Sequence, residues 1–203
     1  TDSSTTPVPI MDNAKGTVEY STGTTCNITD YHNGTNGTAD YYNLVIKSGR
    51  WTIPASSTGS NNNIKAANSF TIEYGATLII ENTSEINSSF TNNGIIEIAE
   101  GTSGTITNVG FWGNFTNSST GKVKQNNYTK IWMSGSCKTV DDYGTWTFGT
   151  DADISFNMFP DDSSFNVKSE AAATNNKYNL YIPVNAEHNV TFKGFDSDNP
   201  MKI

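Results

Sequence analysis

A short pattern of strand-forming residues around a glycine recurs along the middle of the chain, and this repeat constrains the fold more than any other feature. It is most complete in residues 44–53 (LVIKSGRWTI) and 70–79 (FTIEYGATLI). The glycines of successive copies are 26, 19, 27 and 23 residues apart, at Gly49, Gly75, Gly94, Gly121 and Gly144. A period of about 24 residues with alternating apolar positions predicts a solenoid whose coils are built from β-strands.

The same repeat assigns side chains to the inside or the outside of each coil. Each glycine is expected at a corner, where a positive φ or a close backbone approach excludes a side chain, and Gly75 and Gly94 should occupy successive corners. Insertions between coils are expected to project as long turns at residues 54–67 and 99–113. Because side chains alternate along a strand, apolar residues should point inward and their polar neighbours outward: Ile96, Ile98, Trp146 and Phe148 inward, Glu97 and Thr147 outward.

Three segments follow from where the repeat begins and ends. Residues 1–43 are rich in Thr, Ser and Gly and are expected to form an irregular N-terminal arm, whereas residues 44–150 should form the coils. The glycine period fades in residues 151–203, which are expected to add coils, to cap the solenoid or to begin a second β unit. The expected fold is all-β, a parallel β-helix. A β-sandwich is the alternative, because turn signals at intervals of about 8–12 residues are also typical of that class.

Composition narrows the class of partner. Asn, Thr and Ser make up 75 of the 203 residues, and helix-forming residues are scarce. The net charge is −8 and Arg50 is the only arginine, whereas surfaces that track phosphates concentrate Lys and Arg, so nucleic acid is not an expected partner. No run approaches the roughly 20 apolar residues of a membrane helix, so this segment is not expected to insert into a membrane. The chain is expected to be a monomer.

Acidic pairs are the first candidates for catalysis, because a polysaccharide-cleaving enzyme needs two carboxyl groups about 5–9 Å apart. Adjacent residues on a strand point to opposite faces, so adjacent aspartates rarely form such a pair. The acidic pairs of this chain lie in turn-like contexts: Asp141 and Asp142, Asp151 and Asp153, Asp161 and Asp162, and Asp196 and Asp198. The expected role is turn formation by hydrogen bonds to nearby backbone N–H groups. A Ca²⁺ site at Asp151 and Asp153 is the alternative.

Other signatures of catalysis or cofactor binding are missing. His32 and His188 are the only histidines, and neither stands near a nucleophile signature. The sequence has neither the spacing of zinc ligands nor a glycine-rich phosphate loop with its lysine. No catalytic residue, metal site or cofactor is therefore expected, and the chain is predicted not to be an enzyme.

Tryptophan offers a large apolar face that can stack on a sugar ring. Trp51 and Trp146 occupy core-like positions of the repeat. This leaves Phe111–Trp112 and Trp132 as candidate exposed platforms for a carbohydrate, with packing in the core as the alternative for these residues.

Two features fit an oxidising, extracellular compartment, which is the expected location of the chain. Cys26 and Cys137 are the only cysteines, and an even count predicts a disulfide between them, which would close a loop of about 110 residues and contribute roughly 4–5 kcal/mol. Two buried free thiols are the alternative. The chain also carries nine Asn-x-Ser/Thr sequons, which are candidate glycosylation sites: Asn27, Asn33, Asn36, Asn82, Asn87, Asn114, Asn117, Asn127 and Asn189.

Four short blocks carry a resemblance to a known family. Residues 92–98 (NNGIIEI), 105–108 (TITN), 113–117 (GNFTN) and 118–123 (SSTGKV) resemble the N-terminal domain of fungal hyphally regulated (Hyr/Iff-like) and related adhesin-like cell-wall proteins, over roughly residues 40–150. The resemblance implies a secreted, right-handed parallel β-helix. It also implies display in the cell wall, at the tip of a Ser/Thr-rich stalk with a GPI anchor.

The function expected on these grounds is that of a cell-wall adhesin or surface-display domain. Such a domain attaches cells to one another, to a host or abiotic surface, or to cell-wall glycan, and the resemblance supplies no motif from which binding residues can be assigned. A polysaccharide lyase or hydrolase on the same fold is the first alternative. An ice-binding solenoid is the second, suggested by the pairs Thr105/Thr107 and Thr145/Thr147, although such pairs do not recur at the repeat spacing.

Overall fold

The computed structural model describes residues 15–21, 23–28, 41–54, 62–133, 137, 139–156, 163–167, 178–180 and 190–193. These residues form strands and turns, without a helix. The strands in chain order are β1 (Thr17–Tyr20), β2 (Gly23–Asn27), β3 (Tyr41–Ile46), β4 (Gly49–Ile53), β5 (Asn62–Ile72), β6 (Thr77–Ile80), β7 (Ser84–Asn92), β8 (Ile95–Ile98), β9 (Thr107–Phe111), β10 (Phe115–Asn117), β11 (Lys122–Gln125), β12 (Thr129–Met133), β13 (Thr139–Asp142), β14 (Thr145–Phe148), β15 (Asp153–Phe156), β16 (Ser163–Val167), β17 (Tyr178–Leu180) and β18 (Val190–Lys193).

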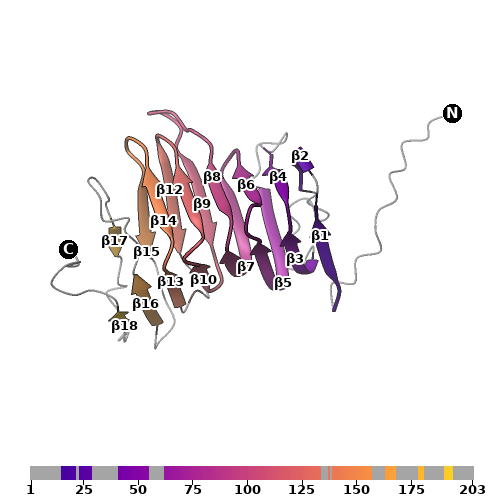
Figure 1. Ribbon diagram of the computed structural model, residues 1–203. Coiled ribbons are helices and arrows are strands. Elements are labelled where there is room, and N and C mark those ends of the chain that lie inside the picture. Colours follow the sequence, from indigo (N-terminus) through magenta and orange to yellow (C-terminus); the bar gives the residue numbers. More distant parts are fainter. Residues whose placement is uncertain are drawn as a thin grey trace.

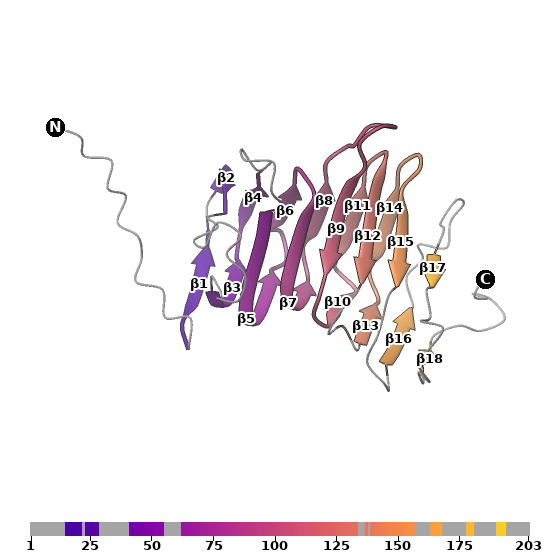
Figure 2. The same cartoon turned by 180° about the vertical axis from the view of Figure 1, so that it is seen from behind.

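The named strands pair in parallel and build a β-helix. They form a twelve-stranded sheet and a six-stranded sheet, and strands that are neighbours in a sheet come from successive coils. Figures 1 and 2 show the coils side by side in one elongated stack, with β1 at one end and β18 at the other. The predicted parallel β-helix is confirmed, and the alternative β-sandwich is wrong.

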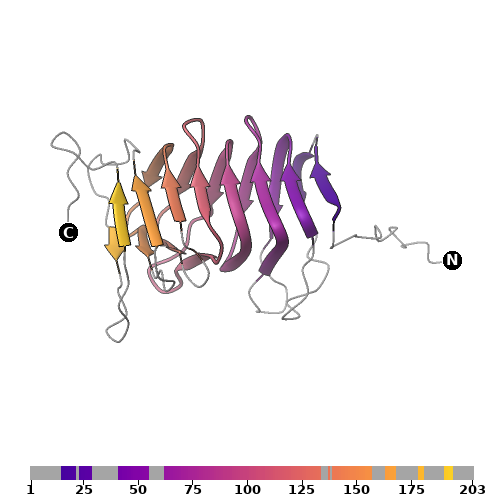
Figure 3. The ribbon, with the colours of Figure 1, turned by 90° about the horizontal axis from the view of Figure 1, so that it is seen from below.

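The coils present three outer faces, one of which forms the front row of parallel strands in Figure 3. The first face consists of the N-terminal halves of β5 and β7, followed by β9, β12, β15 and β17. The second consists of β1, β3, the C-terminal halves of β5 and β7, and then β10, β13, β16 and β18. The third is the six-stranded sheet of β2, β4, β6, β8, β11 and β14. Because β7 continues from the first face to the second, its start pairs with β9 and its end with β10.

Apolar side chains stack in register inside the coils. On the second face the inner row is Leu44, Phe70, Phe90, Phe115 and Val140, each of which pairs in register with the next. All five are buried. The ring centroid of Phe90 lies 4.9 Å from that of Phe70 and 5.7 Å from that of Phe115. Each coil therefore gains its core contacts from the coils directly before and after it, as in other solenoids.

The predicted inward and outward positions can be checked on the third face. The inward residues Ile96, Ile98 and Trp146 are buried, whereas Glu97 is only half-buried and Thr147 is exposed. The alternation is confirmed at these five positions, and the side chain of Phe148 lies outside the described part of the chain.

One inner row on the second face is polar instead of apolar. Asn92 Nδ2 donates to Asn117 Oδ1 at 2.9 Å, and Asn117 Nδ2 donates to Asp142 Oδ1, also at 2.9 Å. The N–H of Gly94 donates to Asn92 Oδ1, and the N–H of Gly144 donates to Asp142 Oδ1. Because buried polar atoms must find partners, this ladder fixes three successive coils in one register.

The glycines of the repeat lie at corners, for two different reasons. Gly75 has a φ of 83° in the turn between β5 and β6, which is a conformation that other residues rarely adopt. Gly94 lies in the next corresponding turn, where a Cβ would clash with the carbonyl oxygens of Ala76 and Glu73. The prediction that both glycines occupy corners is confirmed.

Two predicted boundaries are wrong. The N-terminal segment contributes a coil of its own, because β1 pairs with β3 and β2 pairs with β4. The turns predicted at residues 54–67 and 99–113 are shorter than expected, since residues 62–67 belong to β5 and residues 107–111 to β9.

For residues 151–203 the structure distinguishes between the open alternatives: β15 to β18 pair with strands of the preceding coils, so the described strands there continue the β-helix.

The structure also contradicts the Cys26–Cys137 disulfide, since both thiols are free. Cys26 lies in β2 at one end of the six-stranded sheet, whereas Cys137 lies two residues before β13, in the coil that contains β14 at the other end. Neighbouring strands are about 4.8 Å apart, so several strand spacings separate the two residues. A disulfide requires Cα atoms within about 7 Å. Cys137 is buried, and its burial raises the pKa of the thiol to about 12.

Candidate functional site

Two tryptophans lie on the outside of the first face. Trp132 of β12 is in register with Gly110 of β9, and Trp112 directly follows β9. The neighbouring residues Phe111 and Met133 are fully buried, so the alternation along both strands turns the tryptophans outward. The structure thus places Trp112 and Trp132 near each other on an outer face, where both are half-buried, whereas Phe111 belongs to the core.

Gly110 has no side chain, and the indoles of Trp112 and Trp132 lie close to the space that a side chain would occupy. A Cβ at this position would lie 3.2 Å from Trp112 Nε1 and 3.6 Å from Trp132 Nε1. Both indole nitrogens therefore lie close to Gly110, which is buried although it is on an outer face. Both nitrogens are buried, yet both tryptophans are partly exposed, so the ring surfaces turned away from the sheet face solvent. We call this surface, formed by Gly110, Trp112 and Trp132, the aromatic platform.

Polar side chains border the aromatic platform. Glu85 of β7 is in register with Gly110, and its Cγ would lie 3.7 Å from a Cβ there. Asn87 lies two residues after Glu85 on β7, and Lys130 lies two residues before Trp132 on the outer side of β12. An apolar ring surface bordered by carboxylate, amide and ammonium groups can stack on a sugar ring and hydrogen-bond its hydroxyls.

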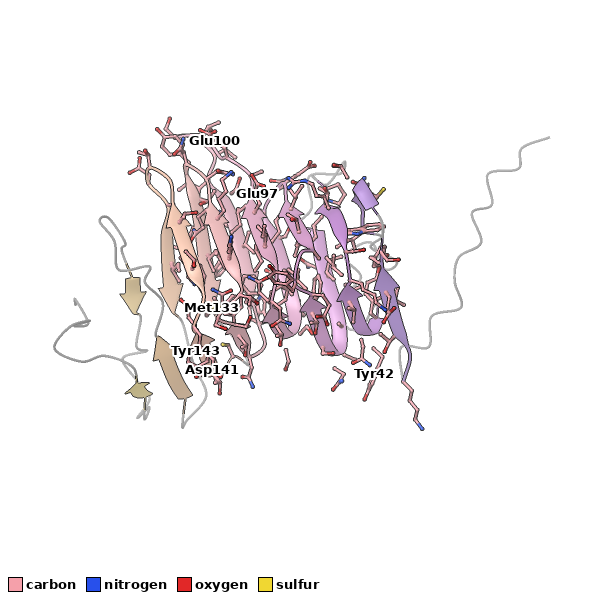
Figure 4. All side chains as sticks on the ribbon, in the orientation of Figure 1. Tyr42, Glu97, Glu100, Met133, Asp141 and Tyr143 are labelled. Atoms are coloured by element: carbon pink, nitrogen blue, oxygen red, sulfur yellow. The ribbon has the colours of Figure 1, made fainter. Side chains whose placement is uncertain are left out.

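The acidic pair Asp141–Asp142 is divided between the inside and the outside of its coil. Asp142 is 3% exposed and accepts the hydrogen bond from Asn117 in the buried ladder. Asp141 points to the other side of β13, well away from Glu97, as Figure 4 shows. The two adjacent carboxylates therefore do not face a common substrate position.

The remaining acidic and histidine candidates are less fully described. Asp151 is exposed in a turn, with a φ of 54°. Its location agrees with the predicted turn role. The other candidates lie outside the described residues, wholly or in their side chains: Asp153 (side chain), Asp161, Asp162, Asp196, Asp198, His32 and His188.

A network of ion pairs crosses the third face around Glu97. Lys124 Nζ lies 2.9 Å from Glu97 Oε1, and Arg50 Nη2 lies 3.3 Å from Glu97 Oε2. The hydrogen bond from Lys124 holds the pKa of the Glu97 carboxyl below its ordinary value, although partial burial opposes this shift. The only arginine of the chain is therefore engaged with a carboxylate from a coil two strands away in the sheet.

We expect Glu97→Gln to lower the free energy of unfolding by no more than about 1 kcal/mol at pH 7, because the lysine and arginine partners are half-exposed. The folded-state pKa of Glu97 is lowered. Its contribution is therefore complete above the unfolded pKa of about 4.3 and is lost as the pH falls through the folded pKa. Urea unfolding of both proteins at pH 7 and at lower pH checks this, with the exposed Glu81→Gln as control. A difference that grows on acidification would contradict it.

Hydroxyl side chains form outward rows on the second face. Thr71, Thr91 and Thr116 are in register on successive coils. The threonine pairs singled out for an ice-binding surface lie elsewhere. Thr107 is buried, so it does not pair with Thr105 on an outer face. Thr145 and Thr147 are exposed on β14, but Lys122 and Lys124 occupy the matching positions of β11. Neither predicted pair belongs to a regular threonine array.

The sequons lie in different environments. Asn117 is fully buried in the ladder, so the structure contradicts its assignment as a glycosylation site of the folded protein. Asn127 uses both ends of its amide, donating to Glu100 Oε1 and accepting from the N–H of Thr150. The others are exposed or half-buried where described, at Asn27, Asn82, Asn87 and Asn114, while Asn33, Asn36 and Asn189 lie outside the described residues.

Within the described ranges no three His, Cys, Asp or Glu side chains gather closely enough to hold a metal ion. The same part of the chain contains no helix of the length and apolarity needed to cross a membrane. No protein-family model, curated protein or solved structure matches the chain.

Proposed function

We propose that the chain is a non-enzymatic adhesion domain at the cell surface, which attaches to polysaccharide through the aromatic platform. The observation that carries this proposal is that the indoles of Trp112 and Trp132, from adjacent coils, both lie close to Gly110 on an outer face. Indole rings are large and apolar, and a cluster of them on a surface marks a site of interaction. The apolar C–H face of a sugar ring can stack on the indoles, and the polar side chains of Glu85, Asn87 and Lys130 can hydrogen-bond the sugar hydroxyls.

The position of the platform favours an extended polysaccharide over a single sugar. The tryptophans come from adjacent coils whose strands lie about 4.8 Å apart in a continuous parallel sheet. Such a surface is broad and is held rigid by the core beneath it, so an extended ligand can lie along it without ordering the protein first. Preorganisation of this kind improves affinity because little conformational entropy is lost on binding.

The non-enzymatic part of the proposal is supported by what the carboxylates of the coils do. Asp142 belongs to the buried ladder, Glu97 is paired with Lys124, and Glu100 accepts a hydrogen bond from Asn127. Each of these contacts gives a carboxylate a structural partner. A polysaccharide lyase or hydrolase remains the competing function, and release of sugar fragments that is abolished by Asp141→Asn would favour it.

We expect Trp112→Ala and Trp132→Ala each to weaken binding to an insoluble polysaccharide by roughly 30-fold. Loss of a central tryptophan at an interface costs on the order of 2 kcal/mol or more, and 1.4 kcal/mol corresponds to tenfold. Depletion isotherms on chitin, β-glucan and mannan measure this. Gly110→Leu should also weaken binding, because a larger side chain displaces both indoles while leaving them in the chain.

The matched control is Tyr74→Ala, which removes an aromatic side chain that is 77% exposed in the turn after β5. It should bind as the unmodified protein does. Melting curves of all variants separate loss of binding from loss of folding. The proposal is wrong if the unmodified protein binds none of the three polysaccharides, or if folded tryptophan variants bind as well as it does.

A further inference from the structure

A sequon lies directly beside the aromatic platform. Residues 87–89 (NSS) belong to β7, and Asn87 points outward on the first face, where it is half-buried. The N–H of Trp112 donates to the carbonyl oxygen of Ile86 at 3.0 Å. Since Ile86 immediately precedes Asn87, this hydrogen bond fixes Trp112 beside Asn87 on the neighbouring strand, about 4.8 Å away across the sheet.

The two segments are held together on both sides of Asn87. A Cβ at Gly113 would clash with the carbonyl oxygen of Ser88, so the backbones are in direct contact there. Two residues further on, the N–H of Phe90 donates to the carbonyl oxygen of Asn114 at 2.7 Å. The relative positions of Asn87 and Trp112 are therefore set by backbone contacts and do not depend on a flexible loop.

The amide of Asn87 is also available. Among the described residues it makes no hydrogen bond, in contrast to the buried Asn117 and the doubly bonded Asn127. A sugar attached to its Nδ2 would begin on the outer side of the sheet, beside the strand position from which the Trp112 side chain projects.

We propose that Asn87 carries an N-linked glycan whose first sugar packs on the Trp112 indole and covers part of the aromatic platform. This inference rests on the proposed function, because it requires a secreted chain and a platform that accepts sugar rings. The chain's own glycan then competes with an external polysaccharide, so the form that is glycosylated at Asn87 attaches more weakly than the form that is not.

The modification itself is ordinary chemistry of the secretory pathway. Asn87 Nδ2 attacks C1 of the first sugar of a lipid-linked oligosaccharide diphosphate. The Nδ2–C1 bond forms, the bond between C1 and the phosphate oxygen breaks, Nδ2 loses one proton, and the lipid diphosphate leaves. The transfer requires a hydroxyl residue at the third sequon position, which is the exposed Ser89.

Two substitutions at Ser89 provide a matched pair. Ser89→Ala removes the sequon and leaves Asn87 and both tryptophans in place, whereas Ser89→Thr retains the sequon. Both changes are made in the full chain, which is secreted from a eukaryotic host together with the unmodified protein. Mass spectrometry of the peptide that contains Asn87 gives the occupancy of the site in each protein.

Quenching of tryptophan fluorescence by acrylamide then reports whether a glycan covers the platform, independently of any polysaccharide. The quenching constant should be larger for Ser89→Ala than for the unmodified protein and Ser89→Thr. Because four tryptophans contribute to the signal, the same comparison is made with Trp112→Phe, where the difference should vanish. Ser89→Ala should also bind the insoluble polysaccharide several-fold more tightly than Ser89→Thr.

The outcomes separate this inference from the proposed function. An unoccupied Asn87, or an occupied one with equal quenching in Ser89→Ala and Ser89→Thr, would overturn the inference. If the unmodified protein binds polysaccharide and these two variants bind it equally well, the glycan at Asn87 does not compete with the polysaccharide. A quenching difference that depends on Trp112, in a protein that binds no polysaccharide, would support the glycan contact and refute only the proposed function.

Discussion

Replacing Phe90 with alanine is expected to destabilise the protein by about 3–5 kcal/mol, which is the usual cost of removing a buried phenylalanine. Phe90 is 1% exposed and lies at the centre of an aromatic cluster, with ring centroids 4.9–5.7 Å from those of Phe70, Phe111 and Phe115. These partners come from the coils on both sides, so the cavity would weaken two interfaces between coils at once.

Urea unfolding followed by circular dichroism measures this change. Thr91→Ala serves as the control, because Thr91 is the next residue of β7 and points outward, and its replacement should change the free energy of unfolding by less than about 0.5 kcal/mol. If Phe90→Ala lowers the free energy of unfolding by less than about 1 kcal/mol, the aromatic stack is not the main interaction that stabilises the packing between coils.

Asn117→Asp is expected to lower the free energy of unfolding by about 3–5 kcal/mol at neutral pH, although it changes a single group. It removes the amide donor that serves the Asp142 carboxylate and places a second carboxylate beside it in the core. Breaking a buried charge-bearing contact in this way leaves a charge without compensation. Because a proton bound between the two carboxyl groups would replace the lost donor, the penalty should shrink as the pH is lowered.

The comparison is made with Asn93→Asp, the same chemical change in the half-buried turn next to the ladder. Unfolding free energies of the unmodified protein and of both variants are measured from pH 7 downward. A small penalty for Asn117→Asp at pH 7, or one that increases on acidification, would contradict the role given to the ladder.

The strands and their inward residues follow from the sequence because they depend on local alternation alone. Ile96 and Ile98 flank Glu97 in a pattern that fits a strand with one buried side, and the structure places them accordingly. The first coil escapes prediction because β2 carries polar residues and a register shift between Thr24 and Cys26, so its alternation is weak. Stacking on β4, a contact between segments distant in sequence, is what organises it.

The ladder and the aromatic platform depend on register between coils, which no local pattern states. Asn92, Asn117 and Asp142 are separated by 25 residues at each step, and this constant spacing is the signal that would have revealed the ladder. Trp112 and Trp132 stand at different offsets in their strands. Their proximity follows only from the pairing of Trp132 with Gly110, a glycine that does not belong to the repeat.

The claim that the platform mediates attachment is tested most directly by the retention of protein-coated beads on a polysaccharide film under increasing shear. The film is made of the polysaccharide that the soluble protein binds best, and the coating density is equal for all variants. Beads that carry the unmodified chain or Tyr74→Ala should remain attached at a shear that removes beads carrying the Trp112→Ala/Trp132→Ala double variant. Equal retention of the folded double variant would contradict the account.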